Sequence, residues 1–364
     1  MPESATIDPA TRLRPDTARL LARMPKAELH LHLDGSVRPS TALAIARERG
    51  LAEGDLALDG MRARLVAPAR CSDQAELLRA FDLPIALMQD TISLARVTSE
   101  LIEDVATDGT LYAEIRWAPA LHTSGGLAME AGIEAVVRGA ELGSEATGVV
   151  VRLIAVALRS HPPEVSVSVA RAASAFVDRG LTGFDLAGPE EGFPDPLLHE
   201  EAFGVARDAG LSITVHAGEW GGASQVRRAL SVRPSRIAHG APAADDDALQ
   251  QELIDRGVTL DLCPTSNVQA GLVNDIAAHP LPRLLRRGVP VTLSTDDRTV
   301  SDLTLVREYE RAVTLLGVTL PELWAMDRHA LDVAFLHHDE PLRARLLAEF
   351  DAFAEKEPAL TGGT

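Results

Sequence analysis

Cysteine and lysine are scarce in this chain of 364 residues. The only two cysteines, Cys71 and Cys263, lie far apart and form no Cys-x-x-Cys pair. A disulfide framework needs several cysteines at regular spacing, so this pattern predicts an intracellular chain without one. Lysine also occurs only twice, at Lys26 and Lys356, which limits any metal chemistry that depends on a lysine side chain.

Long apolar runs and basic clusters are absent too. No run approaches the roughly 18 apolar residues that a membrane-spanning helix needs. Residues 1–25 are polar and interrupted by proline, unlike the apolar core and small-residue cleavage site of a secretory signal. The formal net charge is −18, which repels nucleic acids and anionic membrane surfaces. We therefore expect a cytoplasmic protein with neither nucleic acid nor membrane as a partner, and its oligomeric state stays open.

The chain does contain a repeated alternation of short apolar segments and longer helical patterns. Eight segments are typical of strands, at residues 27–33, 111–119, 149–158, 182–188, 211–219, 236–240, 258–264 and 288–297. Helical patterns such as 132–146 and 248–257 separate most of them. This alternation indicates parallel strands joined by crossover helices.

Eight such strands predict an α/β fold of the (β/α)8 or TIM-barrel type, since near-continuous apolar strands are typical of a parallel sheet buried on both faces. An open, doubly wound sheet is the alternative, but its usual Gly-rich phosphate loop is missing. Barrels routinely use this much chain, so we predict one domain over residues 1–364. Residues 37–110 predict a helical insertion after strand 1 that covers the barrel as a lid, and the residues after 297 predict extra C-terminal helices.

Ionisable residues occur where several predicted strands end. His30 and His32 lie two apart in the first strand, so both imidazoles point to one face. Such a pair arises by chance about 0.3 times in a chain with 11 histidines, so alone it is weak. His216 ends the fifth strand and Asp296 the eighth, and all strands of a barrel open their carboxyl ends onto one face. A metal site is therefore predicted among the ionisable residues at these strand ends.

The ligand types indicate which metal. Imidazole nitrogen with one carboxylate suits Zn²⁺ better than Mg²⁺ or Ca²⁺, which prefer oxygen ligands. A catalytic site keeps one position for water, whose pKa falls on the metal from about 15.7 towards about 7. A second metal in such a barrel can be bridged by a carboxylated lysine on the fourth strand, and residues 182–188 contain none. We expect one Zn²⁺ per chain.

Glu219 follows His216 by three residues, after Ala217-Gly218, where the strand can bend into its loop. It can therefore face the pocket without binding the metal and act as a proton shuttle. The alternative is an ordinary glutamate on a surface loop. His239 and Asp297 also lie at strand ends and join the candidate set.

At these residues the chain resembles the adenosine deaminase family of the amidohydrolase superfamily. The resemblance runs from about Pro25 to Arg307 and rests on the segments PKAELHLHLDGS, GFDLAG, VHAGE, RIAHG, CPTSN and STDDR. It implies a zinc-dependent hydrolase that converts adenosine or 2′-deoxyadenosine to the inosine product and ammonia, in purine salvage. The partner so implied is a small purine nucleoside.

The resemblance also implies a role for each site residue. The zinc ligands would be His30, His32, His216 and Asp296, with His32 also facing the substrate. Glu219 would protonate purine N1 as hydroxide attacks C6, and His239 would orient the attacking water.

The other matched residues would hold the substrate. Asp297 would contact N7, the backbone of Gly188 would contact N3, and Asp34 would meet the 5′-hydroxyl of the sugar. Adenine-specific relatives tend to carry Glu at the position of Asp34, so Asp favours a nucleoside over free adenine. A methylene of difference is enough to misplace a hydrogen bond.

Three positions depart from the family pattern: Ala238, Ser294 and Arg298 replace the common Gly, Asn and Pro. None removes a candidate ligand or Glu219. We expect Arg298 to border the mouth of the site, where it would favour a more anionic 5′ substituent.

Several alternatives stay open. The substrate could be adenine or a 5′-modified adenosine such as aminodeoxyfutalosine. A nucleoside-binding protein without turnover is the alternative from another class, although it predicts a missing ligand or acid. Phe81, Leu83 and Leu87 of the insertion fit either an apolar wall over the purine or ordinary core packing.

Overall fold

Eight parallel strands form the centre of the computed structural model, which describes residues 13–52, 54–336 and 339–362. Residues 1–12, part of the segment that we judged unlike a secretory signal, lie outside that range. The strands pair in sequence order and are β1 (Lys26–His32), β2 (Thr110–Trp117), β3 (Val150–Leu158), β4 (Leu181–Ala187), β5 (Ser212–Ala217), β6 (Arg236–His239), β7 (Thr259–Leu262) and β8 (Val291–Leu293). The predicted (β/α)8 barrel is confirmed, and the open sheet is excluded.

The strands are buried on both faces, which explains their apolar sequences. β6, β7 and β8 are buried at every residue, and β3 at most of them. Every predicted strand except 149–158 nevertheless extends past the observed end, most of all the predicted 288–297. β8 stops at Leu293 because the backbone of Asp296 turns into the left-handed region, with φ 68°.

This turn closes the barrel between its last and first strands. The Asp296 amide donates to the carbonyl of His30 at 3.0 Å, and the His32 amide donates to the carbonyl of Asp296 at 2.8 Å. Ser294 Oγ accepts from the His30 amide at 3.2 Å. The strand that carries two candidate ligands is thus fixed to the loop that carries a third.

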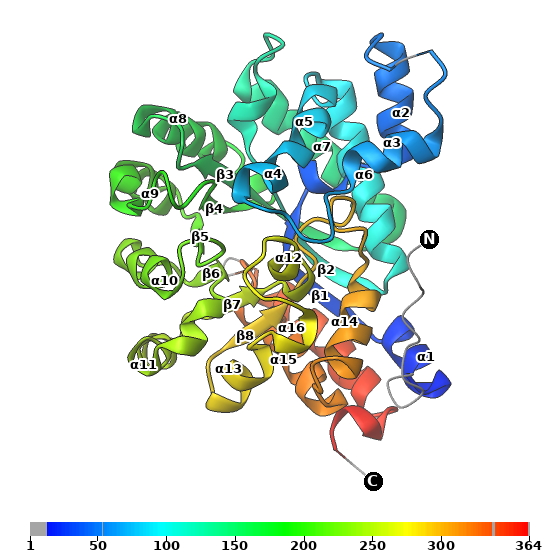
Figure 1. Ribbon diagram of the computed structural model, residues 1–364, viewed down its shortest axis with the longest axis vertical. Helices are drawn as coiled ribbons and strands as arrows, with labels where there is room; N and C mark the ends of the chain where they lie inside the picture. The colour runs from blue at the N-terminus through cyan, green and yellow to red at the C-terminus, as the bar shows by residue number, and fades with distance from the viewer. Residues whose placement is uncertain (1–12, 53, 337–338, 363–364) are drawn as a thin grey trace.

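Helices surround the strands in a ring (Figure 1). Those that follow β2 to β7 are α7 (Met129–Thr147), α8 (Pro163–Ser174), α9 (Glu200–Asp208), α10 (Ala223–Ala229), α11 (Asp247–Arg256) and α13 (Leu281–Arg287). Each has an apolar side against the strands; α7, for example, buries Ile133, Val136 and Val137. α7 ends at Gly148, whose φ of 81° is the left-handed conformation that a helix C-cap commonly adopts.

The predicted insertion after strand 1 is confirmed as a set of helices. They are α2 (Pro39–Glu48), α3 (Leu58–Leu65), α4 (Gln74–Leu78), α5 (Asp82–Leu87) and α6 (Thr91–Thr107). α6 packs along α7 in the outer ring. Figure 1 shows α4 over the middle of the barrel, together with the short α12 (Pro264–Gln269), so the insertion covers the end where the site lies.

The predicted C-terminal helices are also present, as α14 (Leu305–Thr314), α15 (Leu320–Val333) and α16 (Glu340–Ala354). α15 packs against β1 and β8 and so occupies the remaining place in the ring, while α1 (Pro15–Arg23) packs against α14. Among the helices of the described residues, none is long and apolar enough to cross a membrane.

Candidate metal centre and substrate cavity

Four side chains from the ends of two strands, β1 and β5, and from the closing loop converge at the carboxyl end of the barrel. His30 Nε2 lies 3.2 Å from His32 Nε2, which lies 3.2 Å from His216 Nε2. Asp296 Oδ1 is 3.0 Å from His30 Nε2 and 3.3 Å from His32 Nε2. The ligand atoms all lie within 4.8 Å of one another. The structure thus brings together all four candidate ligands.

These separations fit a single zinc ion. Tetrahedral ligands at zinc–nitrogen distances of about 2.0–2.1 Å stand about 3.3 Å apart, close to the four distances above. Burial lowers the pKa of His32 to about 3 and that of His30 well below its usual value, so both imidazoles are neutral, the form that binds metal. Three imidazole nitrogens and a carboxylate suit zinc.

Buried partners orient two of the candidate ligands. His216 Nδ1 lies 2.9 Å from Asp185 Oδ2, and Arg116 Nη1 contacts the same oxygen at 2.9 Å. Burial by itself would raise the pKa of Asp185, but His216 and Arg116 outweigh it and hold that pKa far below its usual value. Ser266 Oγ donates to Asp296 Oδ2 at 2.7 Å. Such partners fix ring orientation and raise the basicity of the ligand.

Two site residues have strained backbones. His239 has φ 66° and Asp296 has φ 68°, in a region that residues other than glycine rarely adopt. His239 Nε2 lies 3.8 Å from Asp296 Oδ2, and its Nδ1 is 3.2 Å from Asn267 Nδ2. This backbone conformation directs both side chains from a strand end into the site. It costs of order 1–3 kcal/mol of conformational energy per residue, and such strain is common at functional sites.

Glu219 lies in the same site, as the sequence predicts, and its side chain is largely buried. The bend of β5 into its loop occurs at Gly218, whose φ is 78°. Burial and the nearby charge of Asp296 raise the pKa of Glu219 to about 8. Glu219 Oε1 is 3.9 Å from His239 Nε2. At neutral pH the carboxyl is therefore held in its protonated form and can donate a proton.

Asp34 and Asp297 complete an acidic group. Burial raises the pKa of Asp34 to about 6, and burial together with Asp296 raises that of Asp297 well above its usual value. Oδ1 of each is buried without a hydrogen-bond partner. A Cβ on Gly35 would lie 1.7 Å from Asp297 Oδ1, so the side chain of Asp297 occupies the space that a larger residue 35 would need.

These residues line a cavity of about 230 Å³. Its other polar residues include Gln74 and Ser160, and the backbone of Gly188, with φ 103°, lies at its edge. None of the described residues that line it is Lys or Arg. Apolar residues form the rest of the wall: Leu77, Leu78, Phe81, Ile85, Ala118, Leu121, Val156, Leu158, Ala187 and Pro189.

The insertion contributes part of this apolar wall. Phe81 lines the cavity, which confirms one of the three residues left open by the sequence. Leu87 is fully buried in the main core, and Leu83 packs against that core. Leu83 and Leu87 therefore have the packing role.

The expectation for Arg298 was wrong. Its side chain is buried and turned away from the cavity: Nη2 lies 2.7 Å from Asp108 Oδ2, and Nη1 lies 3.9 Å from Glu28 Oε2. Because these acidic side chains hold the guanidinium away from the cavity, it cannot pair with an anionic substituent of a substrate bound there. Ser294, which stands where the family commonly has Asn, helps to close the barrel because its Oγ accepts a hydrogen bond from β1.

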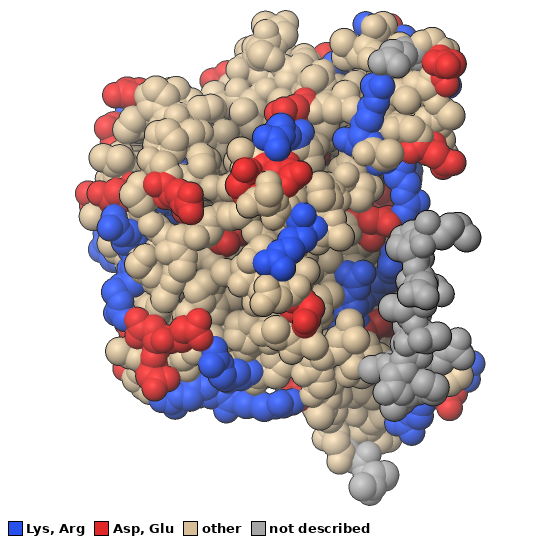
Figure 2. All heavy atoms as spheres, viewed as in Figure 1, with Lys and Arg blue, Asp and Glu red and all other residues tan. Residues whose placement is uncertain are grey.

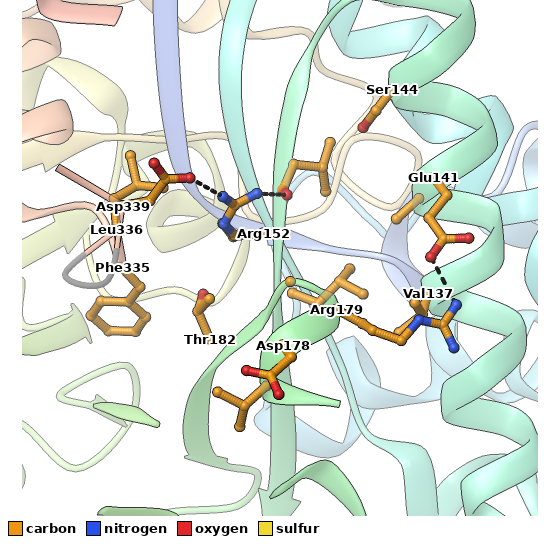
Figure 3. A pocket seen from close by; sticks show the side chains of 15 residues that line it. Val137, Glu141, Ser144, Arg152, Asp178, Arg179, Thr182, Phe335, Leu336 and Asp339 are labelled. Atoms are coloured by element: carbon orange, nitrogen blue, oxygen red, sulfur yellow. Dashed lines mark hydrogen bonds and ion pairs between the residues drawn. The ribbon is translucent and has the colours of Figure 1, made fainter. Parts of the chain in front are cut away.

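A larger cavity of about 550 Å³ lies elsewhere, beside α7 and the amino ends of β3 and β4. Figure 3 shows Arg152 directed at Asp339 and Arg179 at Glu141, pairs separated by 3.3 Å and 2.7 Å. Its cations are thus already paired. Catalytic groups of barrel enzymes lie at the carboxyl ends of strands, so the smaller cavity is the candidate site.

The outer surface shows charge of both signs. Over the middle of the face in Figure 2, where α4 and α12 lie, acidic and basic side chains are interspersed. The concentration of unpaired acidic groups is a property of the cavity beneath.

Known proteins are similar to this chain in both sequence and fold. The family model described as adenosine deaminase matches residues 25–352. The chain belongs to the adenosine deaminase family. A relative from Enterococcus faecalis named adenosine deaminase is 35% identical over 320 residues, which cover 87% of this chain and 94% of the relative. A relative from Sinorhizobium medicae named adenine deaminase is 36% identical over 330 residues, 90% of this chain and 99% of its own.

A solved structure extends the range of substrates among similar proteins. The N6-methyl-AMP deaminase from Arabidopsis thaliana superposes with a TM-score of 0.81 at 28% identity, over 93% of this chain and 100% of that one. The member of the adenosine deaminase family described here is accordingly a hydrolytic deaminase that acts on a C–N bond of a purine. Which purine it takes depends on the cavity.

Sequence reasoning missed the supporting residues. Arg116, Asp185 and Ser266 contact candidate ligands or their partners, yet we assigned them no role. Asp185 lies within the quoted segment GFDLAG and Ser266 within CPTSN. A charged residue inside an otherwise apolar strand was the available signal, because burial of such a group requires a partner.

Proposed function

We propose that this deaminase acts on a neutral purine nucleoside, adenosine or 2′-deoxyadenosine, with one zinc ion per chain. The observation that carries the proposal is the lining of the cavity: Asp34, Glu219, Asp296 and Asp297, with no Lys or Arg among its described residues. A phosphate group would find no Lys or Arg among those residues to pair with its charge. A nucleoside has hydroxyls and ring nitrogens that such carboxyl groups can bind.

The size of the cavity supports a small substrate. At about 230 Å³ it lies below the roughly 300–1,000 Å³ of typical ligand pockets. The unpartnered Oδ1 of Asp34 is a buried acceptor, which gains a hydrogen bond when a hydroxyl group enters. This supports a contact between Asp34 and the 5′-hydroxyl of the sugar.

His30, His32, His216 and Asp296 would hold the zinc ion. Zinc, when bound, supplies Lewis acidity that makes a water molecule acidic enough to react near neutral pH. Asp185 keeps the His216 ring in its orientation through Nδ1, and Ser266 does the same for Asp296 through Oδ2.

Glu219 and His239 would move the protons. The protonated carboxyl of Glu219 donates to purine N1, and His239, kept neutral by burial, accepts a proton from the water that attacks C6. That proton passes to the 6-amino group, the C6–N bond breaks, and ammonia leaves. The second proton of the water returns to Glu219, while N1 keeps its proton in the inosine product.

Asp297 and Gly188 would orient the base. With its raised pKa, the carboxyl of Asp297 is protonated and donates to N7, an acceptor. The backbone of Gly188 lies at the cavity edge for N3, and His32 faces the substrate beside Asp34. Together these contacts place C6 over the catalytic groups.

The test is a panel of substrates with zinc-loaded protein, with ammonia release measured as kcat/KM. The panel contains adenosine, 2′-deoxyadenosine, adenine, AMP, methylthioadenosine and aminodeoxyfutalosine. We expect adenosine or deoxyadenosine to exceed AMP by about 100-fold or more, because a phosphate desolvated without a Lys or Arg partner costs more than the roughly 2.8 kcal/mol to which that ratio corresponds. Preference for adenine, AMP or an anionic 5′ substituent would overturn the substrate assignment.

A further inference from the structure

Glu190 is a buried carboxylate close to the site that the mechanism above does not use. It follows Gly188-Pro189 in the loop after β4 and is only 1% exposed. Burial of a charge is costly unless hydrogen bonds or opposite charges compensate it. The groups that stabilise the charge of Glu190 are therefore also the groups that Glu190 holds in place.

Three consecutive backbone amides donate to this carboxylate. The Glu219 amide reaches Oε1 at 3.2 Å, and the amides of Trp220 and Gly221 reach Oε2 at 3.4 and 2.7 Å. Hydrogen bonds to an ionised acceptor are about twice as strong as neutral ones. The turn that carries the proposed proton donor is therefore fastened to one side chain from another strand end.

A buried arginine fastens the start of the same turn. Arg159 Nη2 donates to the carbonyl of His216 at 2.6 Å. Burial lowers the pKa of Arg159, and the charge of Glu190 opposes that shift. Residues 216–221 are thus held at their beginning by Arg159, from the end of β3, and at their end by Glu190. The bend between them is tight, because a Cβ on Gly218 would lie 2.7 Å from Val226.

The carboxylate of Glu219 needs this support. Its contact with His239 Nε2 is 3.9 Å long, beyond hydrogen-bond range, and the Trp220 side chain, which also acts on this carboxyl, belongs to the same turn. The orientation of the Glu219 side chain therefore depends on the backbone of that turn. A displacement of about 1 Å in a catalytic group can cost about 100-fold in rate.

We propose that Glu190 is a positioning residue for deamination, which aims Glu219 at purine N1 by holding the amides of residues 219–221. The inference rests on the proposed function, because it assigns Glu219 as the proton donor. Glu190 acts on the transition state and not on nucleoside binding or metal content.

The experiment compares E190Q with E191Q. Glu191 is the adjacent glutamate and is exposed, so E191Q makes the same chemical change without touching the turn. Glutamine at 190 keeps the length of the side chain but removes the charge and one acceptor. Each protein is measured for kcat and KM with adenosine, for zinc content, for melting temperature and for inhibition by inosine and by an analogue tetrahedral at C6.

We expect E190Q to lower kcat by about 10–100-fold, the usual cost of losing a residue that orients a catalytic group. KM, zinc content and inosine inhibition should stay within about threefold of E191Q. The inhibition constant of the tetrahedral analogue should rise by the factor by which kcat/KM falls, since such analogues report transition-state binding.

A second variant covers the case in which E190Q does not fold. Gly221→Ala keeps Glu190 but places a methyl group 2.9 Å from Glu190 Oε2 and 2.1 Å from Gln225 Cγ. It should lower kcat in the same selective way. Equal kcat in E190Q and E191Q, or a drop in melting temperature with kcat per zinc-loaded site unchanged in both variants, would overturn the role of Glu190. Absence of ammonia release by the wild-type chain from every 6-aminopurine would instead overturn the proposed function, and this inference with it.

Discussion

The barrel contains two layers of buried charge, and they are completed in different ways. Deeper in the barrel, Arg236 pairs with Glu114 and, at 3.0 Å, with Asp261. Thr292 Oγ1 also donates to Asp261 at 2.7 Å. At the carboxyl end, by contrast, the cavity holds four acidic side chains and no described basic one.

The difference separates a structural network from a functional one. The deeper carboxylates have protein partners for their charge, so they are satisfied by folding alone. In the cavity, by contrast, the carboxyl groups of Asp34 and Asp297 have raised pKa values. The carboxylate of Asp296 lies within 4.8 Å of the ligand atoms of three histidines. The upper layer is therefore where we propose that a metal ion and a substrate bind.

The largest expected effect comes from withholding the cation. Treatment with a chelator should lower kcat/KM by about 10⁴-fold, roughly 5–6 kcal/mol of transition-state stabilisation. The reason is that the four ligands would then hold no metal ion to make the attacking water acidic. The measurement is kcat/KM together with metal content, first in the chelator-treated protein and then after dialysis of that protein against zinc. Full activity in metal-free protein would contradict the metal assignment.

Removal of a cation from the deeper layer should act on stability. R236M leaves Glu114 buried without its charge partner and Asp261 with only the more distant Arg116, at 3.9 Å, which costs about 3–5 kcal/mol in the free energy of unfolding. Urea unfolding measures this loss, and R228M on the exposed face of α10 is the control. A tenfold loss of kcat at unchanged stability would mean that the two layers are not separate.

A smaller effect is expected where the layers meet. D185N removes the carboxylate between His216 and Arg116, and partners of metal-binding histidines are worth about 10–100-fold in metal affinity or activity. Zinc titration with a competing chelator measures the affinity, with D178N at an exposed position as the control. Unchanged affinity would show that His216 needs no orienting partner.

The smallest effect concerns substrate choice. R298M should change the ratio of kcat/KM between adenosine and AMP by less than about twofold, because Arg298 faces Asp108 and not the cavity. Stability should fall instead, as seen by thermal unfolding next to R62M, which breaks an exposed pair with Asp302. A large change in the ratio of kcat/KM between adenosine and AMP would instead show that Arg298 contributes to substrate choice.

The sequence was sufficient for the architecture and for the residues that share the site. Strand alternation placed His30 and His32 on one face, and the rule that barrel strands open onto one end joined them to His216 and Asp296. These inferences depend on local pattern and general topology, which a single chain displays. All nine candidate residues lie at the centre or the cavity that the structure describes.

The errors concern contacts between distant segments. Arg298 lies next to Asp297 in sequence, but Asp108 determines where its guanidinium points. The predicted strand 288–297 ran too long because the left-handed turn at Asp296 depends on pairing with β1, not on the local residues. Asp185 and Glu190 went unnoticed for the same reason: their roles exist only once another strand end lies beside them.

The contact between Gly35 and Asp297 couples two positions 262 apart in numbering, and its consequence concerns how the sequence can change. A side chain at 35 would occupy the place of the Asp297 carboxylate, so each position limits what the other accepts. A library that varies residue 35 alone should return only glycine among active clones. A graft of the His-x-His-x-Asp segment onto another barrel would need both positions transferred together.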